Sequence, residues 1–153
     1  MLKKIMMLTL SCLMIAGCDF GSGSKPRLVV VNVLDKELHT DCHIKGSVNV
    51  PFEQVQEYAI ANWSKDTELV FYCANYKCTA SGESARQLKA LGYEKVYAYE
   101  AGTAEWKKLG YPVEGPCSKA YLNDYEKPAG MEEPTDIIVL SSQELKKKID
   151  ELL

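Results

Sequence analysis

The chain has 153 residues, the size of one domain, and its 46% hydrophobic and 25% charged residues exclude a wholly disordered protein. A formal net charge of −3, from 18 basic and 21 acidic residues, gives no basis for a nucleic-acid partner. The two histidines, His39 and His43, are too few for a His-rich metal site. Six cysteines in so short a chain point instead to redox or sulfur chemistry, because no pair has the Cys-x2-Cys spacing of structural zinc sites.

The first residues have the pattern of a targeting signal. A basic start is followed by an apolar run at 5–16, which is shorter than the ~20 residues that span a bilayer. The run ends in Ile-Ala-Gly-Cys18, which resembles a bacterial lipobox, and Asp19 resembles an inner-membrane retention signal. We therefore expect a lipoprotein with a signal peptide at 1–17, lipidation at Cys18, and a membrane anchor on the periplasmic face of the inner membrane. A plain signal peptide and an uncleaved anchor are the alternatives.

The rest of the chain divides by composition. Residues 18–26 contain the Gly/Ser-rich stretch DFGSGSKP, a flexible tether that reaches roughly 15 Å. Residues 27–116 form the predicted domain, and 117–135 are a polar loop or linker with Pro128, Gly130 and Pro134. Residues 136–153 are expected to form a strand and a helix packed on the domain.

The predicted elements alternate along the domain. Apolar and β-branched runs predict strands at 28–34, 48–50, 68–73 and 96–99, and a last one at 137–140. Helical spacing predicts helices at 52–63, 81–91 and 104–109, and a final helix capped by Ser142. This alternation indicates an α/β fold with a mostly parallel sheet.

The chemistry is concentrated after the strand at 68–73. Cys73 stands at the carboxyl end of this predicted parallel strand, where open α/β sheets bind ligands. The loop that follows precedes a helix, so its N–H groups can stabilise an anion. We expect a thiolate of lowered pKa at Cys73, with Lys77 supplying a nearby positive charge.

Four motifs in order resemble the rhodanese (sulfurtransferase) family over residues 28–116. HIKGSVNVP at 43–51 is similar to the family's HIPGAxNIP, and FYC at 71–73 is similar to its active-site entry. LGYEKVY at 91–97 is similar to LGYxNVY, and the segment 100–113, with Trp106 in the predicted core, is similar to GGxxxWxxxGxPV.

The resemblance implies a function for Cys73. It would attack a sulfane sulfur donor, carry a persulfide and pass the sulfur to a thiol acceptor, which is nucleophilic catalysis without a cofactor. The donor and acceptor are small molecules or proteins. Backbone N–H groups of Ala74 to Cys78 would hold the outer sulfur. The active-site loop comprises Ala74, Asn75, Tyr76, Lys77, Cys78 and Thr79.

The sequence departs from the family at several positions. Asn32-Val33-Leu34 replaces an Asp-x-Arg, and Leu38 replaces an arginine that some thiosulfate-using members carry. These changes weaken the case for an anionic donor such as thiosulfate. Thr79 stands where the phosphatases of this fold need arginine, so phosphatase activity is not expected.

The opening strand and helix of typical members are absent before residue 28. The C-terminal segment IIVLSSQELK at 137–146 looks like that missing unit. We therefore predict a three-layer α/β/α rhodanese-like domain whose C-terminal strand and helix replace the usual N-terminal pair. The alternative is an independent amphipathic tail helix.

The remaining side chains leave alternatives open. Cys78 is either a resolving thiol for Cys73 or a plain loop residue, and Cys42 and Cys117 are either a structural disulfide or unpaired. His43 is expected to hydrogen-bond the backbone. The function predicted is that of a sulfurtransferase or sulfur carrier, with two alternatives: a thiol–disulfide redox protein using Cys73 and Cys78, and a non-catalytic binding module.

Overall fold

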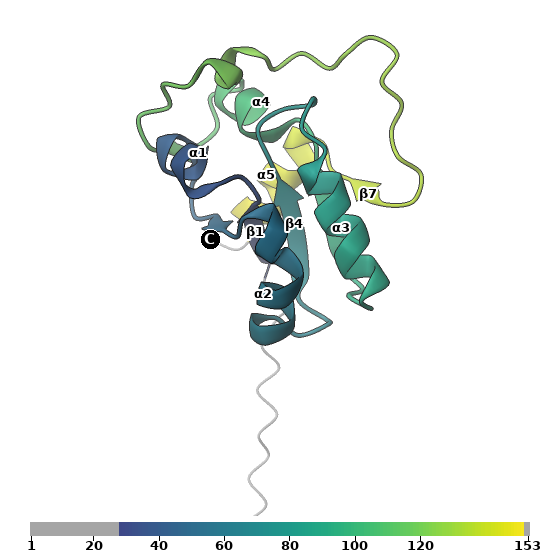
Figure 1. Cartoon of the computed structure of the whole chain (residues 1–153). Coiled ribbons are helices and arrows are strands. Elements are labelled where there is room, and N and C mark those ends of the chain that lie inside the picture. The colour runs from purple at the N-terminus through teal and green to yellow at the C-terminus, as the bar shows by residue number, and fades with distance from the viewer. Residues whose placement is uncertain (1–27, 152–153) are drawn as a thin grey trace, which may run out of the picture.

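A five-stranded parallel sheet is the centre of the computed structural model, which describes residues 28–151 (Figure 1). The strand order is β3-β1-β4-β5-β7, and each strand pairs with its neighbours in parallel. The strands are β1 (Leu28–Asn32), β3 (Val48–Asn49), β4 (Glu68–Tyr72), β5 (Val96–Tyr99) and β7 (Ile138–Val139). The predicted mostly parallel sheet is therefore confirmed, with most strands one or two residues shorter than their apolar runs.

Two apolar clusters lie on opposite faces of this sheet and make the fold three-layered. On one face, Val31 and Phe71 pack with residues of α2 (Val55–Asn62) and α3 (Ala80–Ala90). On the other face, Val30 and Tyr72 pack with residues of α4 (Gly102–Lys108) and α5 (Ser142–Asp150). Side chains of a strand alternate between its faces, which assigns the neighbouring residues of β1 and β4 to different clusters.

Helix α2 begins later than the sequence pattern predicts. Residues Phe52–Gln54 form a short 3-10 turn, η1, before α2 starts at Val55. Helix α3 begins one residue earlier than predicted, at Ala80. Within residues 28–151 no helix has the length and apolar character needed to cross a membrane.

A small layer of structure beside the main sheet was not predicted. Helix α1 (Lys36–Asp41) is capped by the Asp35 carboxylate, which accepts from Leu38 N–H at 2.9 Å. Strands β2 (His43–Ile44) and β6 (Val113–Glu114) pair in antiparallel fashion. These elements are too short for hydrophobic periodicity to identify, since periodicity needs more than two turns or four alternating residues.

A disulfide joins Cys42, just after α1, to Cys117, and settles the pairing that the sequence left open. The adjacent carboxylate of Asp41 accepts hydrogen bonds from the backbone N–H groups of Ser118 and Lys119, each at 3.1 Å. The Ser118 hydroxyl also donates to it and lowers the pKa of Asp41. The start of segment 117–135 is thus fixed to α1. This segment contains one short 3-10 turn, η2 (Ala120–Asn123), and runs as a wide arch to β7 (Figure 1).

The C-terminal strand and helix complete the sheet, as predicted. Strand β7 pairs with β5 through Tyr97↔Ile138 and Ala98↔Val139, and Leu145 of α5 is fully buried against the sheet. The predicted cap at Ser142 is wrong. Ser141 caps α5 in a reciprocal capping box with Glu144, while Ser142 is the first helical residue and is buried. The sequence could be interpreted either way, because both positions are serine.

Candidate functional site

Cys73 follows β4 directly and is fully buried. Its carbonyl accepts from the Thr103 N–H at 3.0 Å and hydroxyl at 3.2 Å, and the Ala74 carbonyl accepts from the Ala104 N–H at 3.0 Å. The start of α4 therefore holds both carbonyls. Gly102 makes this approach possible, since its φ is +64° and a Cβ there would lie 2.6 Å from the Cys73 and Ala74 backbone.

Asn75 shapes the loop that follows. Its backbone carbonyl accepts from the Cys78 N–H at 3.0 Å, and its side-chain oxygen accepts from the Lys77 N–H at 3.1 Å. The expectation that the N–H groups of Ala74 to Cys78 all face a sulfur is therefore wrong, because Asn75 uses two of them. An asparagine at the start of a turn was the sequence signal for this arrangement.

The sulfur of Cys73 is buried beside two polar groups. Its Sγ is 3.1 Å from the Cys78 carbonyl oxygen and 3.5 Å from the Ser81 hydroxyl. Burial raises the pKa of the Cys73 thiol well above its usual value, and the neighbouring Cys78 raises it further. The predicted lowering of the Cys73 pKa is therefore wrong, because desolvation outweighs the N–H groups near the sulfur.

Cys78 instead has the properties predicted for Cys73. The neighbouring Cys73 side chain lowers the pKa of Cys78 to about 6, although partial burial opposes this shift. The backbone N–H groups of Ala74 and Ala80 lower the pKa further, and Ala80 is the first residue of α3.

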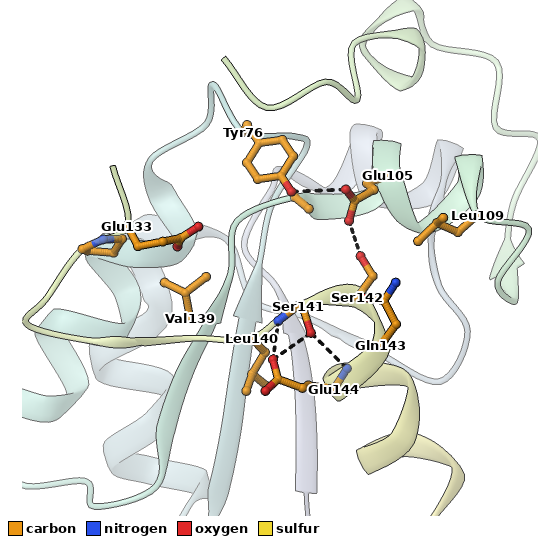
Figure 2. A pocket seen from close by; sticks show the side chains of 12 residues that line it. Tyr76, Glu105, Leu109, Glu133, Val139, Leu140, Ser141, Ser142, Gln143 and Glu144 are labelled. Carbon is orange, nitrogen blue, oxygen red and sulfur yellow. Dashed lines mark hydrogen bonds between the residues drawn. The ribbon is translucent and has the colours of Figure 1, made fainter. Parts of the chain in front are cut away.

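The aromatic and the charged residue of this loop, Tyr76 and Lys77, bind partners other than the two cysteines. Lys77 is exposed and forms an ion pair with Asp124 at 2.8 Å. The Tyr76 hydroxyl donates to Glu105 at 3.2 Å, and the same carboxylate accepts from Ser142, as Figure 2 shows. These contacts join the loop at 74–79 to α4 and to the start of α5. They border a cleft of about 550 Å³, which contains no cysteine.

A second cleft, of about 470 Å³, opens directly on Cys78. We call it the acidic cleft, because its lining has one arginine against five acidic residues. These are Glu83, Glu100, Glu132, Glu133 and Asp136. The arginine, Arg86, pairs with Glu83 at 2.7 Å and with Asp136 at 2.5 Å. Burial, followed by repulsion from Glu133, raises the pKa of Glu100. The environment thus disfavours added negative charge.

The other predicted roles concern residues outside this cleft. The His43 Nδ1–H donates to the His39 carbonyl at 2.8 Å, which agrees with its predicted structural role. Trp106 is buried in the core, as predicted. Asn32 is fully buried, and its side-chain oxygen accepts from the Leu34 N–H at 3.0 Å, while Leu38 is half-buried in α1. Among residues 28–151 no cluster of three or more His, Cys, Asp or Glu side chains suits a metal ion. Cys18 lies outside the described residues.

Known proteins resemble the chain in both sequence and structure. A model of the rhodanese-like domain matches residues 22–109. The thiosulfate:glutathione sulfurtransferase of Saccharomyces cerevisiae is 27% identical over 97 residues, which cover 56% of this chain and 68% of that protein. The crystal structure of the Alr3790 protein from Anabaena sp. has a TM-score of 0.54 at 27% identity, covering 60% of this chain and 70% of that chain. The BH2092 protein from Bacillus halodurans has a TM-score of 0.54 at 28% identity, covering 59% and 65%.

Proposed function

Because the chain belongs to the rhodanese-like domain family, we propose that it is a sulfurtransferase or sulfur carrier that forms a persulfide on Cys73. The observation that carries this proposal is the position of Cys73 at the carboxyl end of β4, with its carbonyl held by α4. The thiosulfate:glutathione sulfurtransferase among its relatives supports the reaction class. The donor is a sulfane sulfur compound and the acceptor a thiol.

The reacting form of Cys73 is its thiolate, which must form against the burial that raises the pKa of this thiol. The Cys73 thiolate attacks the outer sulfur of the donor and forms the persulfide. The donor leaves as a thiolate through the acidic cleft, which Cys78 lines.

The proposal is tested by intact mass. The full chain in a Cys12→Ser/Cys18→Ser background, with Cys78→Ser added, is incubated with a cysteine persulfide donor and desalted. We expect a gain of one sulfur atom, reversed by excess thiol, and no gain when Cys73→Ser is also present. A gain that persists without Cys73, or no gain in any variant that melts normally, would overturn the persulfide assignment.

The same thiol pair supports a second function, thiol–disulfide exchange. A low-pKa thiolate at a helix N-terminus beside a second thiol is the arrangement that redox-active cysteine pairs use. This function predicts a reversible Cys73–Cys78 disulfide on treatment with oxidised glutathione and no sulfur gain from a persulfide donor. If neither change occurs, the non-catalytic binding module becomes the better account.

The proposed location is the periplasmic face of a bacterial inner membrane, with a lipid on Cys18. The Cys42–Cys117 disulfide supports an oxidising compartment, where such bonds persist. Membrane fractionation tests the anchor. The chain should sediment with membranes and become soluble with Cys18→Ser. A Cys18→Ser chain that stays membrane-bound would contradict lipid anchoring at this residue.

A further inference from the structure

The position of Cys78 suggests a step after persulfide formation. The Cys73 sulfur lies 3.1 Å from the backbone carbonyl oxygen of Cys78, and both cysteines are free thiols. A persulfide formed on Cys73 would therefore be in contact with a residue that carries a second thiol.

The two thiols lie at different depths below the surface. Cys73 is fully buried, whereas Cys78 is half-buried and lines the acidic cleft. A thiol acceptor that enters the acidic cleft meets Cys78, which lines it, whereas Cys73 is not part of the lining. The carboxylates of the cleft disfavour thiolate acceptors, whereas Cys78 is already in place. Reactions between groups held in contact benefit from effective concentrations far above those of free thiols.

We propose that Cys78 is a resolving thiol that displaces hydrosulfide from the Cys73 persulfide and leaves a Cys73–Cys78 disulfide. The inference rests on the persulfide function proposed above. The Cys78 thiolate attacks the inner sulfur of Cys73, the bond between that sulfur and the sulfane sulfur breaks, and the latter leaves as HS⁻. The two cysteine sulfurs are oxidised to the disulfide and the sulfane sulfur is reduced to hydrosulfide. An external dithiol reductant then reopens the disulfide and resets the site.

The chemistry of the groups favours this direction. A thiolate stabilised near neutral pH is abundant enough to attack, and hydrosulfide leaves readily because thiols of low pKa are good leaving groups. Under this scheme the protein converts a persulfide donor into free thiol and hydrosulfide at the expense of a dithiol.

The test measures hydrosulfide and mass together on the full chain in the Cys12→Ser/Cys18→Ser background. One equivalent of cysteine persulfide is added without reductant, and hydrosulfide is trapped with a bimane. We expect about one equivalent of hydrosulfide per chain, no retained sulfur, and a loss of two hydrogens that peptide mapping assigns to Cys73 and Cys78. A dithiol should then make release continue over many turnovers.

The matched variants separate this inference from the function it rests on. Cys78→Ser should retain the added sulfur as a persulfide and release at least tenfold less hydrosulfide, while Cys73→Ser should do neither. A wild-type chain that keeps its persulfide as long as the Cys78→Ser chain overturns the resolving role and leaves the carrier function intact. Failure of Cys78→Ser to gain sulfur overturns the carrier function instead. A thermal melt of each variant shows that the site is folded.

Discussion

The two cysteine pairs within residues 28–151 differ in bonding: one is a disulfide and the other is two free thiols. Cys42 and Cys117 are 75 residues apart, yet α1 and the Ser118 region bring them together as a closed disulfide. Cys73 and Cys78 are five residues apart and remain two thiols with opposite pKa shifts. The first pair is fixed by packing and by the Asp41 hydrogen bonds. In the second pair, burial raises the pKa of Cys73, whereas nearby N–H groups help to lower the pKa of Cys78.

The difference teaches that sequence separation does not decide which pair is structural. The long-range pair closes a large loop and can stabilise the fold by restricting the unfolded chain. The short-range pair closes almost no loop, so a bond there would have little effect on the unfolded chain and can open and close without loss of the fold. Stability is therefore expected from one pair and chemistry from the other.

The largest expected effect is on stability. Cys42→Ser with Cys117→Ser should lower the free energy of unfolding by about 4 kcal/mol, because the bond closes a long loop. Urea unfolding followed by circular dichroism measures it. The double variant Cys73→Ser/Cys78→Ser is the control and should change stability far less. Equal losses in the two double variants would show that the pairs do not differ in the way described.

A smaller loss is expected where the thiol pair meets α4. Gly102→Ala should destabilise the fold by about 1–3 kcal/mol, because its φ is positive and its Cβ would collide with the carbonyl that Cys73 presents. It should also alter the Cys78 thiolate, since Ala74 moves with that carbonyl. The control is Gly110→Ala, where φ is also positive, at +72°, but no atom lies within 4 Å of the added Cβ. Similar costs at both positions would show that backbone strain alone, and not the contact with the loop, matters at Gly102.

Substitution of Cys73 should raise the pKa of Cys78. Alkylation of Cys78 should increase with pH and reach half its maximum near pH 6, because only the thiolate reacts and the pKa of Cys78 is about 6. Cys73→Ala removes the hydrogen bond that lowers this pKa most, so the midpoint should move up toward the ordinary cysteine value of about 8.5. Cys73→Ser, which keeps a donor, should move it less. An unchanged midpoint in Cys73→Ala would mean that α3 alone stabilises the thiolate.

The smallest effect concerns the charge around the pair. Thiosulfate should be a poor donor compared with a persulfide of lower charge, and salt should improve it because the acidic cleft repels anions. Glu100→Gln should raise the initial rate with thiosulfate about two- to threefold by removing one cleft carboxylate. Glu57→Gln on the exposed surface of α2 is the control. A rate with thiosulfate that falls with salt would contradict repulsion in the cleft.

The sequence predicted the sheet better than it predicted the site. Strands β1, β4 and β5 are continuous apolar runs because both of their faces are covered, and this pattern is visible without a structure. The Cys42–Cys117 pairing was not predictable, since four cysteines in the domain allow three pairings and α1, which positions Cys42, is too short to detect. The placement of Cys73 after β4 followed from its strand, because that strand ends at Tyr72.

The electrostatics of the thiols depends on contacts that no local pattern reveals. The lowered pKa that was predicted for Cys73 is found at Cys78 instead. Asn75 accepts hydrogen bonds within the loop, and the N–H of Ala80 at the start of α3 helps to lower the pKa of Cys78. The depth of burial at Cys73 depends on α4, which approaches from 30 residues further along the chain. The start of α5 likewise could not be placed to within one residue, because Ser141 and Ser142 can each cap a helix.

The completion of the sheet by β7 also has a consequence for how the protein is made. Strand β1, from the start of the described chain, lies inside the sheet, while β7, from its other end, forms an edge beside β5. A nascent chain that has emerged only to residue 114 can assemble four strands but leaves the outer side of β5 with unpaired N–H and C=O groups, a surface that invites association with other chains. Completion of the sheet must therefore wait for β7. Ribosome stalling or proteolysis within 117–135 would release an aggregation-prone fragment that still carries both reactive thiols.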